Sequence, residues 1–121
     1  LQKCVQFVGH RSDVPRFLAA MDCMILPSRN EGLPNILLET MAFGKPSLCT
    51  RVGGIPEMVS HAKEAYLVDA GAEGIASGLS SILRGEYDLD AMGKHASRRV
   101  SQDFTFAAQG QRLVNLYNSI V

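Results

Sequence analysis

The feature that most constrains the fold of this chain is a set of short apolar segments along its first seventy residues. Residues 22–26 are almost continuously apolar, and shorter runs with strand-forming residues occupy 5–8, 47–50 and 66–68. Continuous rather than alternating apolarity is typical of strands that are buried on both faces of a parallel sheet. The sequence therefore predicts about four short parallel strands.

Helix signals separate these segments. Residues 12–13 supply an N-cap ahead of a helix at residues 14–21. Pro34 opens the next helix, where its missing N–H costs nothing, and Gly44 closes that helix. A short helix is expected at residues 55–59, before the last strand. This alternation of strands and helices is characteristic of α/β proteins.

Beyond residue 70 the apolar residues recur at helical spacing, which predicts three C-terminal helices. Their apolar faces are Ile75, Leu79, Ile82 and Leu83; Leu89, Met92, Ala96 and Val100; and Phe106, Leu113, Tyr117 and Ile120. The expected fold class is α/β, a partial, Rossmann-like doubly wound parallel sheet of about four short strands with C-terminal helices.

Length and charge limit the functions that the chain can have. Its 121 residues make one small domain, short for an α/β enzyme that must hold two substrates. Twelve Lys and Arg balance twelve Asp and Glu, so the net charge favours neither nucleic acid nor an anionic membrane as a partner. The chain begins at Leu1, close to a strand-like segment, and we expect it to be part of a longer protein. It contains no apolar run of membrane-spanning length, and we expect no signal peptide.

Cys4, Cys23 and Cys49 each fall in an apolar, strand-like segment, so we expect three buried thiols. An odd number of cysteines without metal-type spacing favours a reducing, cytoplasmic setting.

The loop at residues 28–34 is the first candidate for a binding site. It directly follows the strand at 22–26, and ligands of open α/β sheets bind beyond the carboxyl ends of the strands. The helix that starts at Pro34 adds a positive dipole end and free N–H groups, which suit an anion such as a diphosphate. Gly32 lets the backbone approach a ligand closely. The expected donors are the backbone N–H groups of Leu33, Asn35 and Ile36.

Two carboxylates flank this anion site. Asn35 and Glu39 are four residues apart and point the same way from the helix. Glu39 lies about 8 Å along the helix from Pro34, which fits the ribose diol of a nucleotide whose diphosphate binds the helix start. A carboxylate can accept from two adjacent hydroxyls, and Glu31 is placed to do so for a sugar. The alternative is that Glu39 pairs with a basic side chain and Glu31 is a solvated loop residue.

Three sequence patterns together carry a resemblance. Glu31 and Glu39 stand in Pro-Ser-x-x-Glu-Gly-Leu-Pro-x-x-x-x-Glu, followed by Met-Ala-x-Gly-x-Pro at 41–46 and Val-Gly-Gly-x-Pro-Glu at 52–57. The chain resembles the C-terminal, donor-binding domain of GT-B retaining glycosyltransferases of the family 4 type. The likeness is greatest to the bacterial enzymes of surface polysaccharide and lipopolysaccharide biosynthesis, and it covers nearly the whole chain.

The resemblance implies a role for each matching residue. As the catalytic residue, Glu31 would hold the hydroxyls of the donor sugar beside the reacting carbon, and Glu39 would hold the ribose. Gly53 and Gly54 are expected to form a closely packed turn. The remaining donor-binding positions are the backbone of Gly32, Leu33, Pro34, Asn35 and Ile36, and, on the nucleobase side, Val8, Gly9 and His10.

The implied activity is transfer of a sugar from a UDP- or GDP-sugar to a glycan or lipid-linked acceptor, with retention at the anomeric carbon. The nucleotide-sugar is a substrate, and no metal or other cofactor is expected. No nucleic acid is expected as a partner. We expect a cytoplasmic protein, either free or peripherally associated with the inner face of the cell membrane.

The chain departs from the family pattern in what it lacks. It contains neither the Arg/Lys pair that neutralises the leaving diphosphate nor an N-terminal acceptor domain, and Arg29 and Arg51 do not match the positions of that pair. Residues 1–121 are therefore interpreted as a partial C-terminal nucleotide-sugar-binding domain. Its incomplete sheet leaves an edge for self-association, and the isolated chain is expected to be inactive.

Three alternatives compete with this interpretation. A noncatalytic nucleotide-sugar-binding or structural fragment of a split or truncated gene would share all of the donor-site residues. A glycosidase also needs two carboxylates, but hydrolysis does not explain an anion-binding helix start between Glu31 and Glu39. Asp88 and Asp90 mimic an Asp-x-Asp metal motif, although their position at a helix start favours capping.

Overall fold

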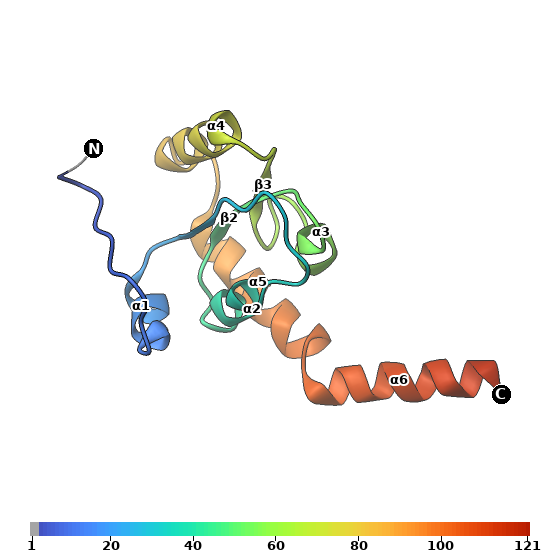
Figure 1. Cartoon of the computed structure of the whole chain (residues 1–121). Coiled ribbons are helices and arrows are strands. Elements are labelled where there is room, and N and C mark those ends of the chain that lie inside the picture. The colour runs from blue at the N-terminus through green and yellow to red at the C-terminus, as the bar shows by residue number, and fades with distance from the viewer. Residues whose placement is uncertain (1–2) are drawn as a thin grey trace.

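The structure is a computed structural model that describes residues 3–121 (Figure 1). Its strands are β1 (Met24–Leu26), β2 (Ser47–Thr50) and β3 (Tyr66–Val68). Its helices are α1 (Val14–Ala20), α2 (Asn35–Ala42), α3 (Ile55–Met58), α4 (Ala72–Leu83), α5 (Leu89–Asp103) and α6 (Phe106–Ile120). Strands and helices alternate as far as α4, and the chain continues in helices, as the sequence predicted.

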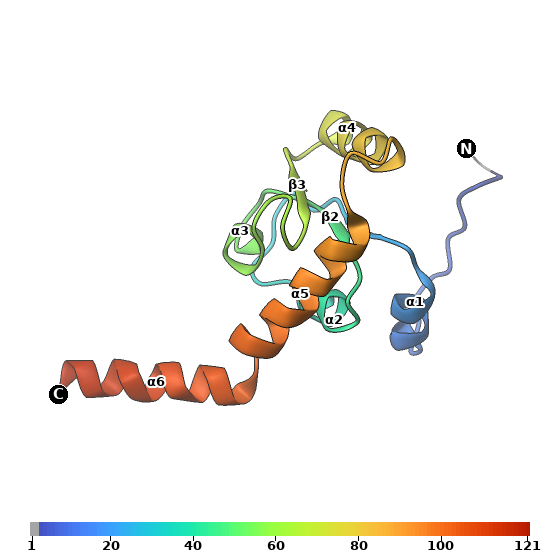
Figure 2. The same ribbon diagram turned by 180° about the vertical axis from the view of Figure 1, so that it is seen from behind.

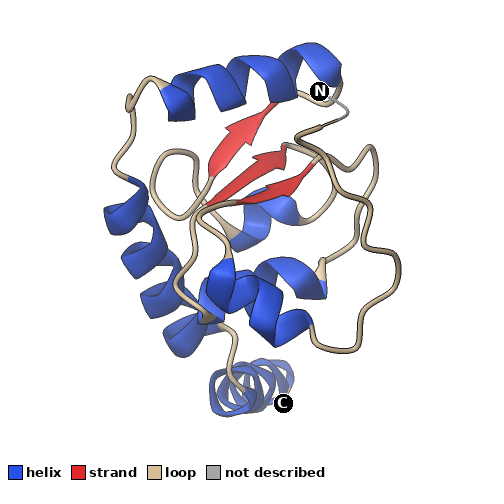
Figure 3. Cartoon of the chain, turned by 90° about the vertical axis from the view of Figure 1, so that its left-hand side faces the viewer, coloured by secondary structure: helices blue, strands red, loops and turns tan. Residues whose placement is uncertain are grey.

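The three strands form one parallel sheet in the order β1-β2-β3. In the central strand, Leu48 pairs with Ile25 on one side and with Tyr66 on the other. Helix α4 covers one face of the sheet, and α2 and α5 lie on the other (Figures 1 and 3). All four residues of β2 are buried, which explains why this segment shows no alternation of polar and apolar residues.

The hydrophobic core lies between the sheet and helices α2, α3 and α5. Cys49, on β2, belongs to this core, and burial raises the pKa of its thiol to about 12. Cys23 is half-buried and Cys4 is exposed, so the prediction of three buried thiols is correct for Cys49 alone. The core side chains from α2, α3 and α5 include Leu37, Met41, Ile55, Met58 and Ala96.

The predicted strand at residues 5–8 does not form, and the prediction of about four strands is corrected to three in the part of the chain that the structure describes. Phe7 is 96% exposed, and Val5 and Val8 are exposed as well. A strand needs a partner strand and an apolar surface to be stable. In a doubly wound sheet, strands that are consecutive in the chain need not be neighbours, and no strand within residues 3–121 pairs with this segment.

Helix α6 forms as predicted, but its apolar face is not buried. Phe106 is 96% exposed and Ile120 is 72% exposed. The helix extends away from the rest of the molecule in both views of the ribbon (Figures 1 and 2). Leu83, at the end of α4, is also exposed. The apolar spacing of residues 106–120 therefore predicts the helix correctly but not its packing within this chain.

Helix starts agree with the sequence signals to different degrees. Asp88 caps α5, because its carboxylate accepts a hydrogen bond of 2.9 Å from the backbone N–H of Ala91. This confirms the capping interpretation of Asp88. Asp13 occupies the N-cap position of α1, but its carboxylate binds the Arg11 side chain at 2.8 Å instead of the helix backbone.

Helices α2 and α5 cross where two glycines meet. Gly44 adopts a φ of 65° just after α2, as expected of a residue that closes a helix. A Cβ atom on Gly93, in α5, would lie 2.1 Å from the carbonyl oxygen of Gly44. The backbone of α5 can therefore approach the end of α2 only because residue 93 has no side chain.

Replacement of Gly93 by Ala tests this contact. The Cβ atom would clash with backbone, so Gly93→Ala should lower the free energy of unfolding by about 2–3 kcal/mol, measured by urea denaturation. Gly110→Ala is the matched control, because no atom lies within 4 Å of a Cβ built on this glycine of α6. Its better helix propensity should raise stability by about 0.5–1 kcal/mol. Changes of the same sign in the two variants would contradict this account of the packing.

Candidate functional site

The loop that joins β1 to α2 lies at the carboxyl end of the sheet and is fixed by a residue of the central strand. Thr50 ends β2 and is fully buried. Its hydroxyl donates a hydrogen bond of 2.6 Å to the backbone carbonyl of Ser28. The hydroxyl of Ser28 in turn donates to Oε1 of Glu31 at 2.6 Å. The position of the half-buried Glu31 side chain is thus linked to the core of the sheet.

The turn after β2 supports the same loop from its other side. The backbone N–H of Gly54 donates to the carbonyl of Gly32 at 2.9 Å. A Cβ atom on Gly53 would lie 1.7 Å from the carbonyl oxygen of Glu31, and Gly53 has a φ of 53°. The prediction that Gly53 and Gly54 form a closely packed turn is confirmed, and the surface on which they pack is the backbone of the loop.

Three N–H groups are free at the start of α2. Within residues 3–121, the N–H groups of Leu33, Asn35 and Ile36 have no hydrogen-bond acceptor, whereas that of Leu37 bonds to the carbonyl of Pro34 at 3.1 Å. Nothing lies within 4 Å of a Cβ built on Gly32, so the space beside this residue is open. An anion can therefore reach the positive end of the helix without displacing protein groups.

The two predicted carboxylates lie on either side of these free N–H groups in the chain. Glu39 is exposed on α2, one turn beyond Asn35, which is also exposed. In the part of the chain that the structure describes, neither Glu31 nor Glu39 forms an ion pair, so the alternative of a paired Glu39 finds no partner there. Along the chain, the Glu31 carboxylate bonded to Ser28 comes first, the free N–H groups follow, and the solvent-facing carboxylate of Glu39 comes last.

Two shallow clefts border this segment. One, of about 310 Å³, separates the start of α2 from the junction of α5 and α6, and is lined by Leu33, Asn35, Leu38, Asp103, Phe104, Gln109 and Arg112. The other, of about 230 Å³, lies between the loop and the start of α4 and is lined by Pro27, Arg29, Gly71, Ala72 and Ile75. The sequence did not predict that residues 103–112 approach Asn35, because nothing local links positions so far apart.

The segment predicted to lie near the nucleobase is not brought to the loop. Val8, Gly9 and His10 are all exposed, and nothing lies within 4 Å of a Cβ built on Gly9. The extended segment that contains them runs along the outside of the molecule before the chain enters α1 (Figures 1 and 2). Their assignment to the nucleobase side stays a prediction.

The two arginines near the loop have separate positions. Arg29 lines the cleft beside α4, and Arg51 lines a larger cleft of about 570 Å³ along β3, together with His61, Asp69 and Glu73. Both arginines are exposed, and within residues 3–121 neither forms an ion pair. Neither arginine lines the cleft beside Asn35.

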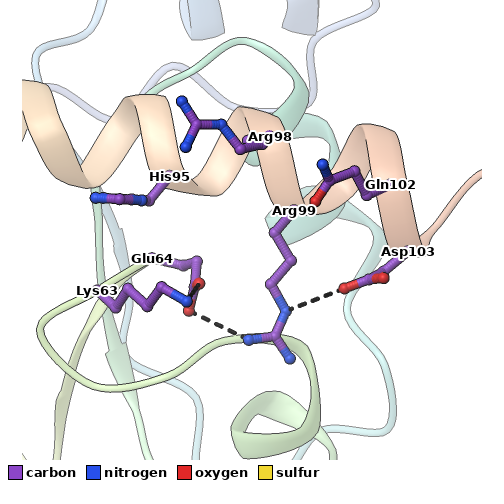
Figure 4. Close-up of a pocket in the computed structure, with 7 residues that line it drawn as sticks. All are labelled: Lys63, Glu64, His95, Arg98, Arg99, Gln102 and Asp103. Carbon is purple, nitrogen blue, oxygen red and sulfur yellow. Dashed lines mark hydrogen bonds and ion pairs between the residues drawn. The ribbon is translucent and has the colours of Figure 1, made fainter.

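Charged side chains of α5 and of the segment after α3 form a cluster away from the predicted loop residues (Figure 4). Arg99 donates to the carboxylate of Glu64 at 3.2 Å, to the hydroxyl of Ser60 at 3.2 Å and to the carbonyl of Glu57 at 3.1 Å. Burial raises the pKa of Glu64, but the Ser60 N–H and the charges of Arg99 and Lys63 outweigh it and hold that pKa below its usual value. The pairing therefore stabilises the fold above the ordinary pKa of Glu and is lost as the pH falls through the lowered one.

Neither a metal site nor a membrane span is evident in the described residues. In residues 3–121 there is no group of three or more His, Cys, Asp or Glu side chains placed to hold a metal ion. No helix in the same range is long and apolar enough to cross a membrane. The two side chains of the Asp-x-Asp pattern have partners within the protein: Asp88 caps α5, and Asp90 contacts Lys94 at 3.3 Å.

Comparison with known proteins identifies the family. The family described as "Glycosyl transferases group 1" matches residues 1–85 of the chain. The chain belongs to this family. The expected resemblance to GT-B glycosyltransferases is thereby confirmed, and the solved neighbours of this glycosyltransferase chain share its Rossmann-like α/β fold.

Relatives match this glycosyltransferase chain over almost its entire length. N-acetyl-alpha-D-glucosaminyl L-malate synthase of Bacillus anthracis is 36% identical over 117 residues, which cover 96% of this chain and 30% of that protein. UDP-Gal:alpha-D-GlcNAc-diphosphoundecaprenol alpha-1,3-galactosyltransferase of Escherichia coli is 27% identical over 123 residues, covering 100% of this chain and 31% of that protein. The chain thus spans about a third of the length of these curated relatives.

A solved structure shows the same arrangement of elements. The crystal structure of Anabaena Alr3699/HepE in complex with UDP superposes with a TM-score of 0.85 and 26% sequence identity. The superposition covers 98% of this chain and 33% of that one. The architecture of the glycosyltransferase chain therefore corresponds to about a third of that longer chain.

The contact between Gly53 and the loop gives a prediction for stability. Gly53→Ala should lower the free energy of unfolding by about 3 kcal/mol, because it adds a backbone clash to the strain of a positive φ. Gly85→Ala is the control: Gly85 has a φ of 72°, but nothing lies within 4 Å of its Cβ position. This variant should lose only the strain energy, about 1 kcal/mol. Equal losses in urea denaturation would show that the Gly53 contact with Glu31 is not tight.

Proposed function

We propose that the protein carrying this chain transfers a sugar from a nucleotide-sugar to a glycan or lipid-linked acceptor, with retention at the anomeric carbon. The observation that supports this most is the order of groups along one segment. Glu31 precedes the free N–H groups at the start of α2, and Glu39 follows them on the same helix. A sugar, a diphosphate and a ribose occur in the same order along a nucleotide-sugar.

Each group has a chemical task in this proposal. Glu31 accepts hydrogen bonds from hydroxyls of the sugar and fixes the reacting carbon relative to the acceptor. The N–H groups of Leu33, Asn35 and Ile36 bind the diphosphate, whose negative charge increases as it leaves. Glu39 accepts from the two ribose hydroxyls. The rate enhancement comes from positioning and from stabilisation of the leaving group.

The names of relatives support the donor class. The Escherichia coli relative is named for UDP-Gal, and Anabaena Alr3699/HepE was crystallised with UDP. We therefore propose a UDP- or GDP-sugar as donor, with no metal or other cofactor. The Asp88 and Asp90 pattern does not support a metal, since both side chains have other partners.

The cations that meet the leaving diphosphate are proposed to come from outside this chain. Arg29 and Arg51 lie in clefts other than the one beside Asn35. Since the chain spans about a third of its curated relatives, the acceptor site is also assigned to other residues of the gene product. We expect residues 1–121 alone to be inactive and the full-length gene product to work in the cytoplasm, free or at the inner face of the membrane.

A noncatalytic nucleotide-sugar-binding protein is the second candidate, because the short span relative to the curated enzymes also fits a split or truncated gene. Such a protein would bind donor without releasing nucleotide from it. The two candidates are separated by turnover in the full-length gene product.

Replacement of the two carboxylates tests the proposal. With the full-length gene product, Glu31→Gln should reduce turnover of the sugar donor by about 100–1,000-fold, because the sugar is no longer fixed in the reactive geometry. Glu39→Gln should instead raise the donor KM by about 10–100-fold, since it weakens charge-assisted bonds to the ribose. The measurement is release of nucleoside diphosphate from a panel of UDP- and GDP-sugars.

Asp90→Asn is the matched control, because Asp90 is an exposed carboxylate on α5 whose contact with Lys94 is solvated. It should leave both kinetic parameters within twofold of wild type. Wild-type turnover by Glu31→Gln would remove Glu31 from the mechanism, and an unchanged KM in Glu39→Gln would remove Glu39 from the ribose site.

A further inference from the structure

We propose that Ser28 and Thr50 are positioning residues for Glu31: the Thr50 hydroxyl fixes the Ser28 backbone, and the Ser28 hydroxyl holds the Glu31 carboxylate in its sugar-binding orientation. This inference rests on the proposed function of Glu31. It assigns a role to two hydroxyl groups whose hydrogen bonds lead to Glu31.

Thr50 is the fixed point of this arrangement. Its side chain is fully buried at the end of the central strand, where Thr50 pairs with Val68 of β3. The hydroxyl has one proton, and the short bond of 2.6 Å to the Ser28 carbonyl contrasts with 3.4 Å to the Leu26 carbonyl. The proton is therefore directed to Ser28, and the loop begins at a position fixed by the sheet.

Ser28 transmits this position to the carboxylate. Its hydroxyl donates to Oε1 of Glu31 at 2.6 Å, a distance within the range for a hydroxyl bonded to a carboxylate. Oε2 has no hydrogen-bond partner within residues 3–121, so it stays available to a hydroxyl of the sugar. One oxygen of Glu31 thus orients the group while the other can bind.

The loop backbone at Glu31 and Gly32 is held by a second contact that does not involve the two hydroxyls. The Gly53 and Gly54 turn already packs against the carbonyls of Glu31 and Gly32. The turn leaves the Glu31 side chain free to rotate, and ordering a long side chain costs conformational entropy. The Ser28 bond orders it before the donor arrives, so loss of this bond should affect sugar recognition but not binding of the nucleotide.

The test compares the affinity and turnover of a nucleotide-sugar with the affinity of UDP alone, using the full-length gene product. UDP-glucose, UDP-galactose, UDP-N-acetylglucosamine and GDP-mannose are screened first, and the donor that turns over best is used; if it is GDP-mannose, GDP replaces UDP. Ser28→Ala should reduce kcat/KM for this donor about tenfold, while the Kd of the nucleoside diphosphate by calorimetry stays within twofold. Ser28→Thr keeps the hydroxyl and should restore at least half of the lost kcat/KM.

Thr50→Val and Thr50→Ser test the role of the Thr50 hydroxyl. Thr50→Val has nearly the same shape but no hydroxyl, and it should also lower kcat/KM about tenfold, whereas Thr50→Ser should remain near wild type. Because both hydroxyls act through one carboxylate, the double variant Ser28→Ala/Thr50→Val should lose little more than either single variant. If Thr50→Val fails to fold, the half-buried Ser28 still decides the question.

Three outcomes would overturn the proposal. A Ser28→Ala variant with wild-type kcat/KM would show that the carboxylate needs no such support, while leaving the proposed function intact. An equal loss of nucleoside diphosphate affinity and turnover would show that Ser28 has a general structural role only. A wild-type protein that neither binds nor turns over any donor of the panel would end the proposed function, and with it this inference.

Discussion

The structure depends on the complete burial of β2 between two parallel neighbours. Because Ser47 to Thr50 are all buried, and Leu48 and Cys49 pair with a strand on each side, the end of this strand is a rigid point at the carboxyl edge of the sheet. Thr50 holds the loop after β1 from that point, and the chain turns at once into Gly53 and Gly54, which pack on the same loop. A polar loop that carries the carboxylate proposed to bind the sugar is in this way supported by the hydrophobic core.

This arrangement separates two requirements that the chain has to meet. Stability comes from the apolar contacts between the sheet and helices α2, α3 and α5, and from the bonds of Arg99 on α5 to Glu64 and to the carbonyl of Glu57 in α3. The proposed binding of a donor requires open N–H groups at the start of α2 and a solvent-facing Glu39, neither of which is bonded to another protein group in the described residues. The loop can therefore present unsatisfied groups to a ligand without weakening the core.

Much of the fold near this loop could be predicted from local sequence. The apolar run before Pro27, the Pro34 helix start and the Gly44 helix end are signals that act over a few residues, and the structure follows them. The strand predicted at residues 5–8 does not form, and the apolar face of the correctly predicted α6 is exposed, because burial depends on partners that a local pattern does not specify. The order of groups from Glu31 to Glu39 was predictable for the same local reason. The links from Thr50 to Ser28 and from Arg112 to the cleft beside Asn35 join distant positions, and no local signal could have found them.

The central claim is that the segment from Glu31 to Glu39 binds a nucleotide-sugar along its length, and a crystal structure of the full-length gene product with its preferred donor tests it most directly. The account predicts diphosphate oxygens about 2.9 Å from the N–H groups of Asn35 and Ile36, ribose hydroxyls on Glu39 and sugar hydroxyls on Glu31. A nucleotide bound elsewhere, such as in the cleft along β3 that Arg51 lines, with the start of α2 empty, would contradict it.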